Sequence, residues 1–538
     1  MSEVELVVTG GRLVDGTGNP WRYADVAIDA GRIVAVTAPG DAPAAARVVD
    51  ATGHIVAPGF VDIHSHSDLA VLARPGAEEK LRQGVTTEVV GNCGISVVNS
   101  APDSIDELRS YALPILGFPE VPWDWSDTSS YLDRVAAARP AVNVATLLGL
   151  GSVRCAVSGF DSGRPTSEER QRMVALARDA LAQGAAGLSS GLVYAPGSYS
   201  TPEEIWELAA EAARVGAIYS THMRDQGDGF LDSVREALEV GHRTGVAVHI
   251  AHHKVVGRRN WGLVSESLRL LDEARQAGID AGSDVYPYLA GSTAMTALLP
   301  DWVAAGGHAA MMARLRDPEE RSRIKDDWRT GRPNWDNRVG SLGYENISIS
   351  YVGTPENEDL VGLSLSDAAA KRGRSDEPAD FLLDLLEHDD GKLGNIQFAC
   401  SEDDLRQVMR HETTSFGSDG LLVGERPHPR LHGTFPWILG EYVRESQVLS
   451  LEEAIRKMTS QSARRLALPG IGLIDPGYRA DLVVFDPATV AGPATYDQPT
   501  LPPIGIRDVL VGGQFAVESG DVTGVRAGTA LRRTPATS

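Results

Sequence analysis

Two histidines separated by one residue, His64 and His66, end a largely apolar run that begins at Ile55. In a β-strand, residues i and i+2 point to the same face, so both imidazoles could approach a single ion. Neutral imidazole is a common zinc ligand in proteins. The pair therefore indicates a metal site at the carboxyl end of a strand and a metallohydrolase, although two exposed histidines in a loop would give the same pattern.

Further histidines stand where other apolar segments end. The chain has 13 histidines among 538 residues, and five of them fall at the ends of three predicted strands. These five are His64, His66, His222, His252 and His253. Because barrel enzymes carry their chemistry at the carboxyl ends of the strands, the pattern favours one shared metal site.

Two of the candidate ligands have alternatives. Cys93 lies just past an apolar strand, where a thiolate would bind zinc and could bridge two ions; the alternative is a small buried hydrophobic residue. Alternation along the strand places His252 and His253 on opposite faces, and the pattern alone does not show which face is inward.

A carboxylate at the end of the last predicted strand, Asp419, is the candidate general base. General-base catalysis needs a carboxylate within hydrogen-bond reach of the water that a metal activates. Asp419 would accept a proton from that water and return it to the leaving amine. The alternative is a helix N-cap aspartate, which a Ser-Asp-Gly segment also suits.

The elements that would position these residues alternate between strand and helix. Eight segments are predicted as strands: 55–64, 85–92, 142–150, 185–192, 217–222, 246–252, 279–286 and 412–419. Amphipathic segments, predicted as helices, separate most of them: 167–183, 202–215, 231–244 and 263–277. Eight strands that alternate with helices predict an α/β fold of the TIM-like (β/α)8 barrel class.

Both ends of the chain have the pattern of short strands with tight turns. They predict a small β-sandwich domain formed by residues 1–56 and 470–538, beside a metal-dependent hydrolase barrel at 57–469. The charged region from about 300 to 393 interrupts the alternation between the seventh and eighth strands. It predicts an inserted subdomain that could act as a lid. The tail after Val525 is expected to fray.

The composition restricts the partners and the compartment. Net charge is −23, from 50 basic and 73 acidic residues, which argues against a nucleic-acid partner because phosphates would be repelled. Three cysteines form no disulfide framework and fit a reducing compartment. No signal-peptide pattern opens the chain, and no apolar run approaches the roughly 20 residues of a membrane span. We therefore expect a cytoplasmic protein that acts on a small molecule and binds neither membrane nor nucleic acid.

In their order and spacing, these segments resemble the amidohydrolase superfamily and, within it, the N-acyl-D-amino-acid deacylase (D-aminoacylase) family. The resemblance covers most of the chain, from residues 10–18 to the strand around Asp481. Its most specific parts are the His-Ser-His segment at 64–66 and the segments 91–94, 187–194, 221–224, 252–254, 417–420 and 427–430.

The resemblance implies zinc at the mouth of a barrel that carries a small β-sandwich. In such enzymes one zinc is tightly held by the residues that match Cys93, His222 and His252, which selects His252 over its neighbour. The matches of His64 and His66 would serve a second, weaker metal position. No carboxylated lysine is evident, so the Cys93 thiolate would take the place of that bridge.

The resemblance also assigns the remaining site residues. Asp419 matches the catalytic acid/base, while Lys254 and Arg430 match positions that hold the substrate carboxylate. Arginine can clamp a carboxylate through two parallel hydrogen bonds. Three further positions match residues that line the substrate pocket: Tyr194, Tyr286 and Ser292. The two tyrosines could instead be packed aromatics at the rim.

The sequence thus predicts a zinc-dependent hydrolase of N-acyl-D-amino acids that releases a D-amino acid and a carboxylate. The alternatives are an amidohydrolase that acts on a cyclic amide or imide or on an N-carbamoyl group, and a non-catalytic barrel. One departure from the family pattern concerns the substrate pocket, because Leu150 stands where members often carry a histidine after the third strand.

Overall fold

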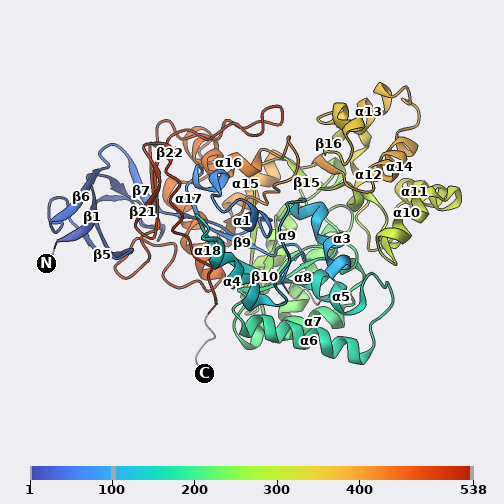
Figure 1. Ribbon diagram of the computed structural model, residues 1–538, viewed down its shortest axis with the longest axis horizontal. Helices are drawn as coiled ribbons and strands as arrows, with labels where there is room; N and C mark the ends of the chain where they lie inside the picture. The colour runs from blue at the N-terminus through green and yellow to red at the C-terminus, as the bar shows by residue number, and fades with distance from the viewer. Residues whose placement is uncertain (1–2, 99–104, 534–538) are drawn as a thin grey trace.

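The computed structural model describes residues 3–98 and 105–533, and its centre is a parallel barrel (Figure 1). Hydrogen bonds join eight strands in the order β8-β9-β10-β11-β12-β13-β14-β18. These are β8 Phe60–Asp62, β9 Val85–Val90, β10 Asn143–Gly149, β11 Gly187–Gly191, β12 Ile218–His222, β13 Ala247–Ile250, β14 Ala281–Val285 and β18 Thr414–Phe416. A parallel bridge between Ser65 and Gly420 joins the first strand to the last and closes the barrel. The predicted (β/α)8 fold is confirmed.

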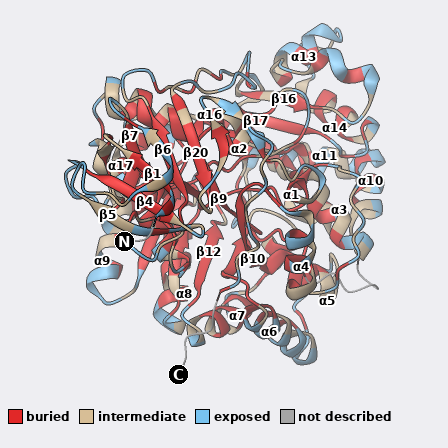
Figure 2. Cartoon of the chain, turned by 60° about the vertical axis from the view of Figure 1, so that its left-hand side comes forward, coloured by how far each residue is buried: buried red, intermediate tan, exposed pale blue. Residues whose placement is uncertain are grey.

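Helices cover the outside of the barrel, which explains why its strands are buried on both faces. Every residue of β9, β10, β11 and β12 is buried (Figure 2). The covering helices include α6 Ser167–Ala182, α7 Pro202–Arg214, α8 Phe230–Thr244 and α9 Val264–Gln276. Capping boxes at Thr166 and Thr201 fix the starts of α6 and α7, because each threonine accepts a hydrogen bond from a main-chain N–H that the helix leaves free.

Two β-sheets built from both ends of the chain form a sandwich, as predicted (left in Figure 1). One sheet has the order β5-β4-β1-β6 and the other the order β22-β21-β20-β19-β7-β2-β3. Their strands are β1 Val4–Thr9, β2 Arg12–Leu13, β3 Arg22–Tyr23, β4 Asp25–Asp29, β5 Arg32–Thr37, β6 Ala45–Asp50, β7 Ile55–Pro58, β19 Leu482–Phe485, β20 Ile506–Val511, β21 Gln514–Glu518 and β22 Asp521–Val522. Leu6 and Ile28 of the first sheet share a buried core with Val56, Leu482 and Leu510 of the second.

The sandwich leads directly into the barrel at Gly59. The predicted strand 55–64 is two strands in the structure, because β7 pairs with β19 of the sandwich and β8 pairs with β9 of the barrel. A Cβ at Gly59 would lie 2.2 Å from the hydroxyl of Thr86, so only glycine fits where the chain changes sheets.

The chain between the seventh and eighth barrel strands forms a unit with its own core. A small antiparallel sheet has the order β15-β17-β16, with β15 Ala290–Ala294, β16 Ile347–Tyr351 and β17 Gly394–Phe398. Five helices belong to it: α10 His308–Arg316, α11 Pro318–Thr330, α12 Arg338–Leu342, α13 Leu365–Lys371 and α14 Pro378–His388. Leu315, Trp328 and Leu382 belong to a buried cluster of their own, separate from the barrel core. The strands that flank residues 300–393 therefore belong to the same sheet as the strand within them.

The prediction that the tail frays after Val525 is wrong for the residues that the structure describes. The main chain of Gly528 donates to Pro140, that of Leu531 donates to Val144, and Arg533 is buried. The tail extends β-pairing at the end of the barrel opposite the strand carboxyl ends. Residues 534–538 lie outside the described part of the chain.

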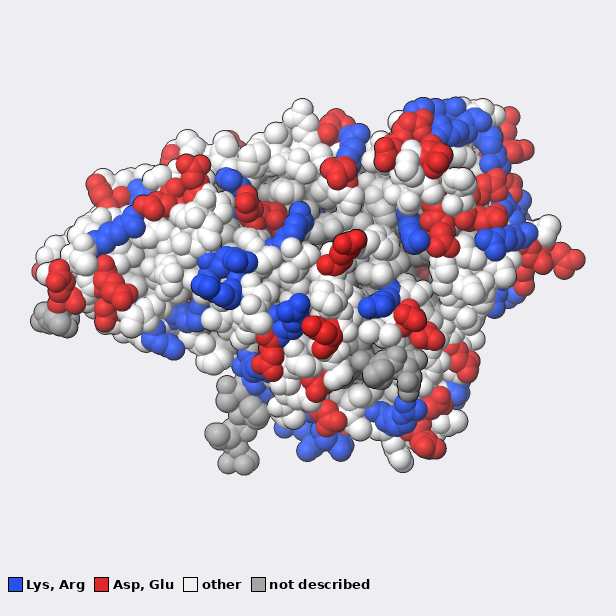
Figure 3. All heavy atoms as spheres, viewed as in Figure 1, with Lys and Arg blue, Asp and Glu red and all other residues white. Residues whose placement is uncertain are grey.

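The surface charges and the helices bear on the expected partners. On the face shown in Figure 3, acidic and basic side chains are interspersed over the sandwich, the barrel and the inserted unit. Among residues 3–98 and 105–533, no helix combines the length and the apolar character that crossing a bilayer requires.

Candidate metal centre

A polar pocket at the carboxyl ends of the barrel strands contains the residues predicted for the site. Those that line it are His66, Cys93, Tyr194, His222, His252, Lys254, Tyr286, Ser292, Asp419 and Arg430. His64 lies beside the lining residues His66 and Cys93 and is fully buried. The fold therefore gathers, at one end of the barrel, side chains that are up to 366 positions apart in the sequence, from His64 to Arg430.

Three buried side chains form what we call the first cluster: Cys93, His222 and His252. One ligand atom of each lies within 4.8 Å of the others. Cys93 Sγ is 3.5 Å from His252 Nε2, and among the described residues neither ring nitrogen of His222 has a hydrogen-bond partner. Buried polar atoms normally have partners, and a thiolate with two imidazoles is a donor set that suits zinc. These residues therefore fit a zinc ion.

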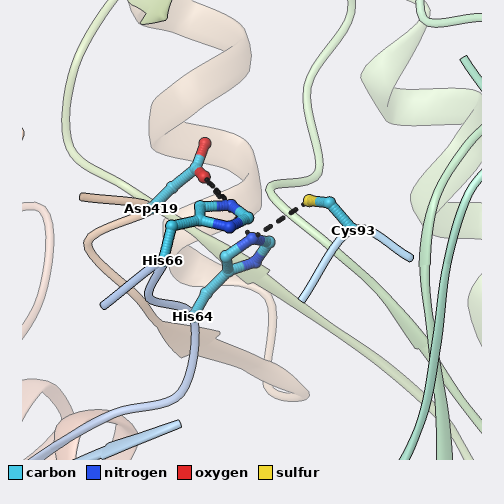
Figure 4. Close-up of side chains that lie close together, drawn as sticks. All are labelled: His64, His66, Cys93 and Asp419. Carbon is cyan, nitrogen blue, oxygen red and sulfur yellow. Dashed lines mark hydrogen bonds and ion pairs between the residues drawn. The ribbon is translucent and has the colours of Figure 1, made fainter. Parts of the chain in front are cut away.

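A second cluster, formed by His64, His66 and Asp419, shares Cys93 with the first (Figure 4). His66 Nε2 lies 3.1 Å from Asp419 Oδ1, and His64 Nε2 lies 3.3 Å from Cys93 Sγ. His64 Nε2 is also 3.4 Å from Asp419 Oδ1. Cys93 thus stands between the two clusters, in a position to bridge them.

Three residues of the clusters have a left-handed backbone. The φ angles are 54° at Cys93, 34° at His252 and 49° at Asp419. This conformation is uncommon outside glycine and costs on the order of 1–3 kcal/mol per residue. Each of the three comes shortly after a barrel strand, where the turn redirects the side chain across the barrel mouth. Such strain is concentrated at functional sites in proteins.

The turn at His252 decides which of two neighbouring histidines faces the pocket. Within β13, His249 points into the barrel, where its Nε2 lies 2.9 Å from Asp284 Oδ2. Regular alternation would send His253 inward as well. The left-handed residue reverses this order, so that His252 joins the first cluster and His253 Nε2 lies 2.8 Å from Ser267 Oγ on helix α9.

Two glycines allow the main chain to approach the clusters closely. A Cβ at Gly191 would lie 2.0 Å from the carbonyl oxygen of Cys93. A Cβ at Gly417 would lie 2.5 Å from the Cβ of His64. The glycines of the segments around residues 191 and 417 therefore serve to bring the strands together beneath the potential ligands.

The imidazoles of the two clusters differ in protonation. Burial lowers the pKa of His222 and lowers that of His252 to about 3. Burial alone would lower the pKa of His66 as well, but hydrogen bonds to Asp419 and Cys93 raise this pKa to about 9. The first cluster therefore offers neutral imidazoles, which a metal needs, while His66 holds a proton at neutral pH.

The same electrostatics acts on the sulfur and the carboxylate. Burial on its own would raise the pKa of the Cys93 thiol, but neighbouring His64 lowers it well below the usual range. Burial would likewise raise the pKa of Asp419, but Arg430 and His64 hold it well below its ordinary value. Both groups are therefore anionic at neutral pH.

Arg430 is already paired with the candidate base. Its Nη1 lies 2.8 Å from Asp419 Oδ2, and both side chains are buried. Its Nη2 donates to the main-chain oxygen of Ser292 at 3.0 Å. The sequence pointed to Arg430 only as a partner of the substrate, so the contact with Asp419 is a second role that the structure adds.

Lys254 and Tyr286 complete a cationic end of the pocket. Lys254 Nζ lies 5.4 Å and Arg430 Cζ 4.7 Å from the centre of the Tyr286 ring. Lys254 Nζ donates to the main-chain oxygen of His252 at 3.4 Å, and within the described part of the chain the buried Tyr286 hydroxyl has no hydrogen-bond partner. Burial lowers the pKa of Lys254 to about 8. This end is suited to an anionic group that hydrogen-bonds to a phenol.

The other two predicted pocket residues lie where the barrel meets the inserted unit. Tyr194 packs its ring 5.2 Å from that of His222, and its hydroxyl lies 2.9 Å from Thr293 Oγ1. Ser292 lies next to Thr293 in β15. The inserted unit therefore supplies part of the pocket wall.

Three residues outside the predicted set help to position the potential ligands. Asp284 accepts a hydrogen bond from the main-chain N–H of His252 at 2.8 Å and lies 3.2 Å from His64 Nδ1. Gln226 Nε2 lies 3.2 Å from His252 Nδ1, and Arg338 of the inserted unit donates to Gln226 Oε1 at 2.9 Å. The position of Asp284 at a strand end was a usable signal; nothing in the sequence pattern marked the other two.

The sequence matches the amidohydrolase family over residues 47–337 and 362–517. The chain belongs to this family. This amidohydrolase is 38% identical over 511 residues to the N-acyl-D-glutamate deacylase of Alcaligenes xylosoxydans xylosoxydans. The aligned region covers 95% of this chain and 93% of the relative. It is also 38% identical over 539 residues to the D-aminoacylase of the same organism, which covers 99% and 98%. The predicted membership of the D-aminoacylase family is confirmed.

Solved structures agree with this assignment. The N-acyl-D-glutamate deacylase of Bordetella bronchiseptica, in complex with zinc and a phosphonate inhibitor, matches the amidohydrolase with a TM-score of 0.82 at 35% identity, over 99% of this chain and 100% of that one. A second match is a D-aminoacylase with a binuclear metal centre, in which one metal activates and the second attenuates. Its TM-score is 0.82 at 36% identity, and the match covers 98% of this chain and 100% of that one.

Proposed function

We propose that this amidohydrolase is a zinc-dependent enzyme that hydrolyses the amide bond of N-acyl-D-amino acids to a D-amino acid and a carboxylate. The observation that carries the proposal is the arrangement of one pocket. The first cluster lies beside the anionic Asp419, and Lys254, Arg430 and Tyr286 lie at one end. That combination suits a substrate with both an amide and a carboxylate, and the named relatives act on N-acyl-D-amino acids.

The first cluster would hold the tightly bound zinc, with Cys93, His222 and His252 as ligands. His64, His66 and Asp419 would form a second, weaker position with Cys93 as the bridge. When bound, zinc polarises the acyl oxygen and makes a water molecule nucleophilic at neutral pH.

The three free cysteines suit a reducing compartment, and we place the enzyme in the cytoplasm.

The reaction divides among the side chains as follows. Asp419 accepts a proton from the attacking water and returns it to the amide nitrogen as the C–N bond breaks. Arg430 keeps Asp419 anionic so that it can act as the base. Lys254, Arg430, Tyr286 and Ser292 would bind the substrate carboxylate, and Tyr194 would line the acyl side of the pocket. One water is consumed for each amide bond broken.

Preference for the D-enantiomer follows from fixing two ends of the substrate. With the carboxylate held by the cations and the acyl carbon held at the first cluster, the bond from Cα to the side chain can point in only one of two directions. In the L-enantiomer the side chain and the hydrogen exchange places, so one enantiomer loses either a contact or its reactive geometry.

The proposal can be tested by quantifying metal in the purified protein together with an activity panel. The panel pairs N-acetyl-D-leucine, -methionine, -glutamate and -aspartate with their L-enantiomers, and adds a cyclic imide and an N-carbamoyl-D-amino acid. We expect at least one zinc per chain and a D-over-L ratio in kcat/KM of at least about a hundredfold. Zinc-loaded protein that hydrolyses the cyclic imide but no N-acetyl-D-amino acid would overturn the proposal.

A further inference from the structure

The barrel closes between its first and last strands with less main-chain pairing than elsewhere in the ring. The other neighbouring strands are joined by ladders of three or more residue pairs. Among the residues that the structure describes, a single bridge from Ser65 to Gly420 joins β8 to β18. We call this junction, formed by residues 62–66 and 417–420, the seam. Side-chain contacts are therefore needed to hold its two sides in register.

The seam carries three of the groups proposed to act at the site. His64 and His66 follow β8, and Asp419 follows β18 (Figure 4). The contact of His66 Nε2 with Asp419 Oδ1, at 3.1 Å, spans the seam. The main-chain N–H of Asp419 also donates across it, to the carbonyl oxygen of His64 at 2.7 Å. A shift of one side against the other would therefore move the candidate base relative to the two imidazoles.

One buried lysine crosses the seam from outside the two strands. Lys80 lies in the short helix α2 (Glu78–Leu81) and is fully buried. Its Nζ donates to Asp62 Oδ2 on the first strand at 2.7 Å and to Ser418 Oγ, just past the last strand, at 3.1 Å. The hydroxyl of Ser65 lies 3.4 Å from the same nitrogen. An ammonium group has three N–H donors, so Lys80 can bind both sides of the seam at once.

Asp62 completes this cross-link. Its Oδ1 accepts hydrogen bonds from the main-chain N–H groups of Ser418 at 2.8 Å and of His64 at 3.3 Å. Its Oδ2 accepts from the Ser418 hydroxyl as well as from Lys80. Because Ser418 directly precedes Asp419, the cross-link fixes the turn that presents the candidate base.

The charges of the cross-link are hidden from water, which favours a positional role over a purely stabilising one. Burial alone would lower the pKa of Lys80, but Asp62 and Glu88 raise it, so the ammonium group stays charged. Glu88 Oε2 lies 3.7 Å from Nζ. A buried ion pair can often be replaced by apolar side chains of similar volume without loss of stability. Charged hydrogen bonds are short and directional, however, and directional bonds suit the task of fixing one strand against another.

We propose that Lys80 is a positioning residue for the reaction, which holds Asp419 at hydrogen-bond distance from His66 by linking the two sides of the seam. The inference rests on the proposed function, in which Asp419 is the base. A base must lie within hydrogen-bond reach of the proton that it accepts. Lys80 does not line the pocket, so its effect on the reaction passes through the residues that it holds.

The first test is Lys80→Met, which removes the charge and the donors but keeps most of the volume. A misplacement of about 1 Å can slow a reaction about a hundredfold, so kcat per bound zinc should fall by about 10- to 100-fold while KM changes less than about threefold. The zinc affinity of the weaker position should fall at least about tenfold, and that of the tighter position should change less than about threefold, because His222 and His252 follow other strands.

The measurements are steady-state kinetics on an N-acetyl-D-amino acid and calorimetric zinc titrations of the metal-free enzyme. Zinc content is determined on the same preparation. Partial unfolding would lower the rate and the zinc content together and would leave kcat per bound zinc unchanged. The ratio therefore separates a displaced base from a loss of folded protein.

Lys457→Met is the matched control. Lys457 is the other buried lysine among the described residues, and its Nζ donates to the carbonyl oxygen of Thr414 at 3.1 Å. Thr414 begins β18, at the end of the strand away from the site. This variant removes a buried ammonium group beside the same strand and should leave kcat per bound zinc and both zinc affinities unchanged. Equal losses in Lys80→Met and Lys457→Met would overturn the positioning role.

Ser418→Ala decides the question if Lys80→Met does not fold. It deletes only the hydroxyl that connects Lys80 to the turn before Asp419. Loss of one such hydrogen bond should lower kcat per bound zinc by about threefold to tenfold. An unchanged kcat per bound zinc in Ser418→Ala, or in a folded Lys80→Met, would overturn the proposal.

The outcomes separate this inference from the function on which it rests. Wild-type enzyme that turns over no N-acyl-D-amino acid would contradict the proposed function. The zinc titrations need no substrate, so they test the geometry of the second cluster on their own. If Lys80→Met left the affinity of the weaker position unchanged, the positioning role would be overturned whatever the substrate.

Discussion

The two clusters of potential ligands share the sulfur atom of Cys93, yet their side chains differ in protonation and in the contacts that they already make. The first cluster has imidazoles that burial keeps neutral, and His222 has two ring nitrogens without hydrogen-bond partners in the described part of the chain. In the second cluster, His66 and Asp419 are bound to each other and Asp419 is bound to Arg430. A metal entering the first cluster would replace the contact between Cys93 and His252, whereas one entering the second would also have to break ion pairs and remove protons.

If the first cluster holds a zinc ion as proposed, this difference leaves Asp419 free to act as the base. If Asp419 were a full-strength ligand, it could not also carry a proton from water to the amide nitrogen. Arg430 competes for Asp419 Oδ2 at 2.8 Å and leaves Oδ1 toward His64 and His66. The carboxylate is thereby oriented and anionic.

The largest effect on zinc content and activity is expected when a proposed ligand of the first cluster is removed. His252→Ala should lose the tightly bound zinc and lower kcat/KM at least about a thousandfold, because the polarising ion is gone. Metal content and activity are measured on the same preparation. His253→Ala is the matched control, since His253 contacts Ser267 rather than the cluster. Equal loss of zinc in the two variants would contradict the assignment.

The next largest effect concerns the base. Asp419→Asn keeps the shape of the side chain but cannot accept the proton, so kcat should fall by about 10²–10⁴-fold while the first zinc remains bound. Kinetics at saturating zinc and the metal content of the variant check this. If the variant instead lost the zinc and regained its activity when zinc was added in excess, Asp419 would be a ligand and not the base.

Arg430→Met tests whether Arg430 keeps Asp419 anionic and also binds the substrate carboxylate. Arg430 lowers the pKa of Asp419, so its removal raises that pKa. A base works only when deprotonated; hence the acidic limb of the kcat/KM profile should move to higher pH, with activity lost sooner as pH falls. KM for carboxylate substrates should rise about tenfold. An unshifted acidic limb with normal KM would remove Arg430 from both roles.

The success of the sequence predictions follows from how the barrel is encoded. Continuous apolar strands ending in histidine, cysteine or aspartate, as at His222 and Asp419, mark both the element and the edge where chemistry gathers. The pattern could not indicate that His252 has a left-handed backbone, because φ at one residue is set by tertiary contacts such as the bond from its N–H to Asp284. Alternation left the choice between His252 and His253 open, and only the family resemblance favoured His252, the one that lines the pocket in the structure.

The remaining parts of the site depend on contacts between distant segments. Arg338 donates a hydrogen bond to Gln226, which lies 112 residues earlier in the chain. Arg338 belongs to the inserted unit, whose elements do not follow the alternation of strand and helix that predicts a barrel. The last described residues likewise pair with β10, which local composition could not indicate. Long-range pairing of this kind leaves no trace in spacing, so it becomes visible only in the structure.

The effect expected to leave the rate at saturating zinc least changed is in metal affinity, and it tests the contrast in protonation directly. His66 must lose a proton before it can bind a metal, and its pKa is about 9. Asp284 raises the pKa of His64 well above its ordinary value against the effect of burial, so His64 must lose a proton as well. Zinc affinity of the weaker position should therefore rise by up to about a hundredfold per pH unit between pH 6 and 8. The pKa of His252 is about 3, so the affinity of the tighter position should change less over this interval. Calorimetric zinc titrations of the metal-free enzyme at several pH values measure both, and His66→Gln should abolish only the weaker one. Parallel pH dependence of the two affinities would show that the protonation of His66 does not distinguish the clusters.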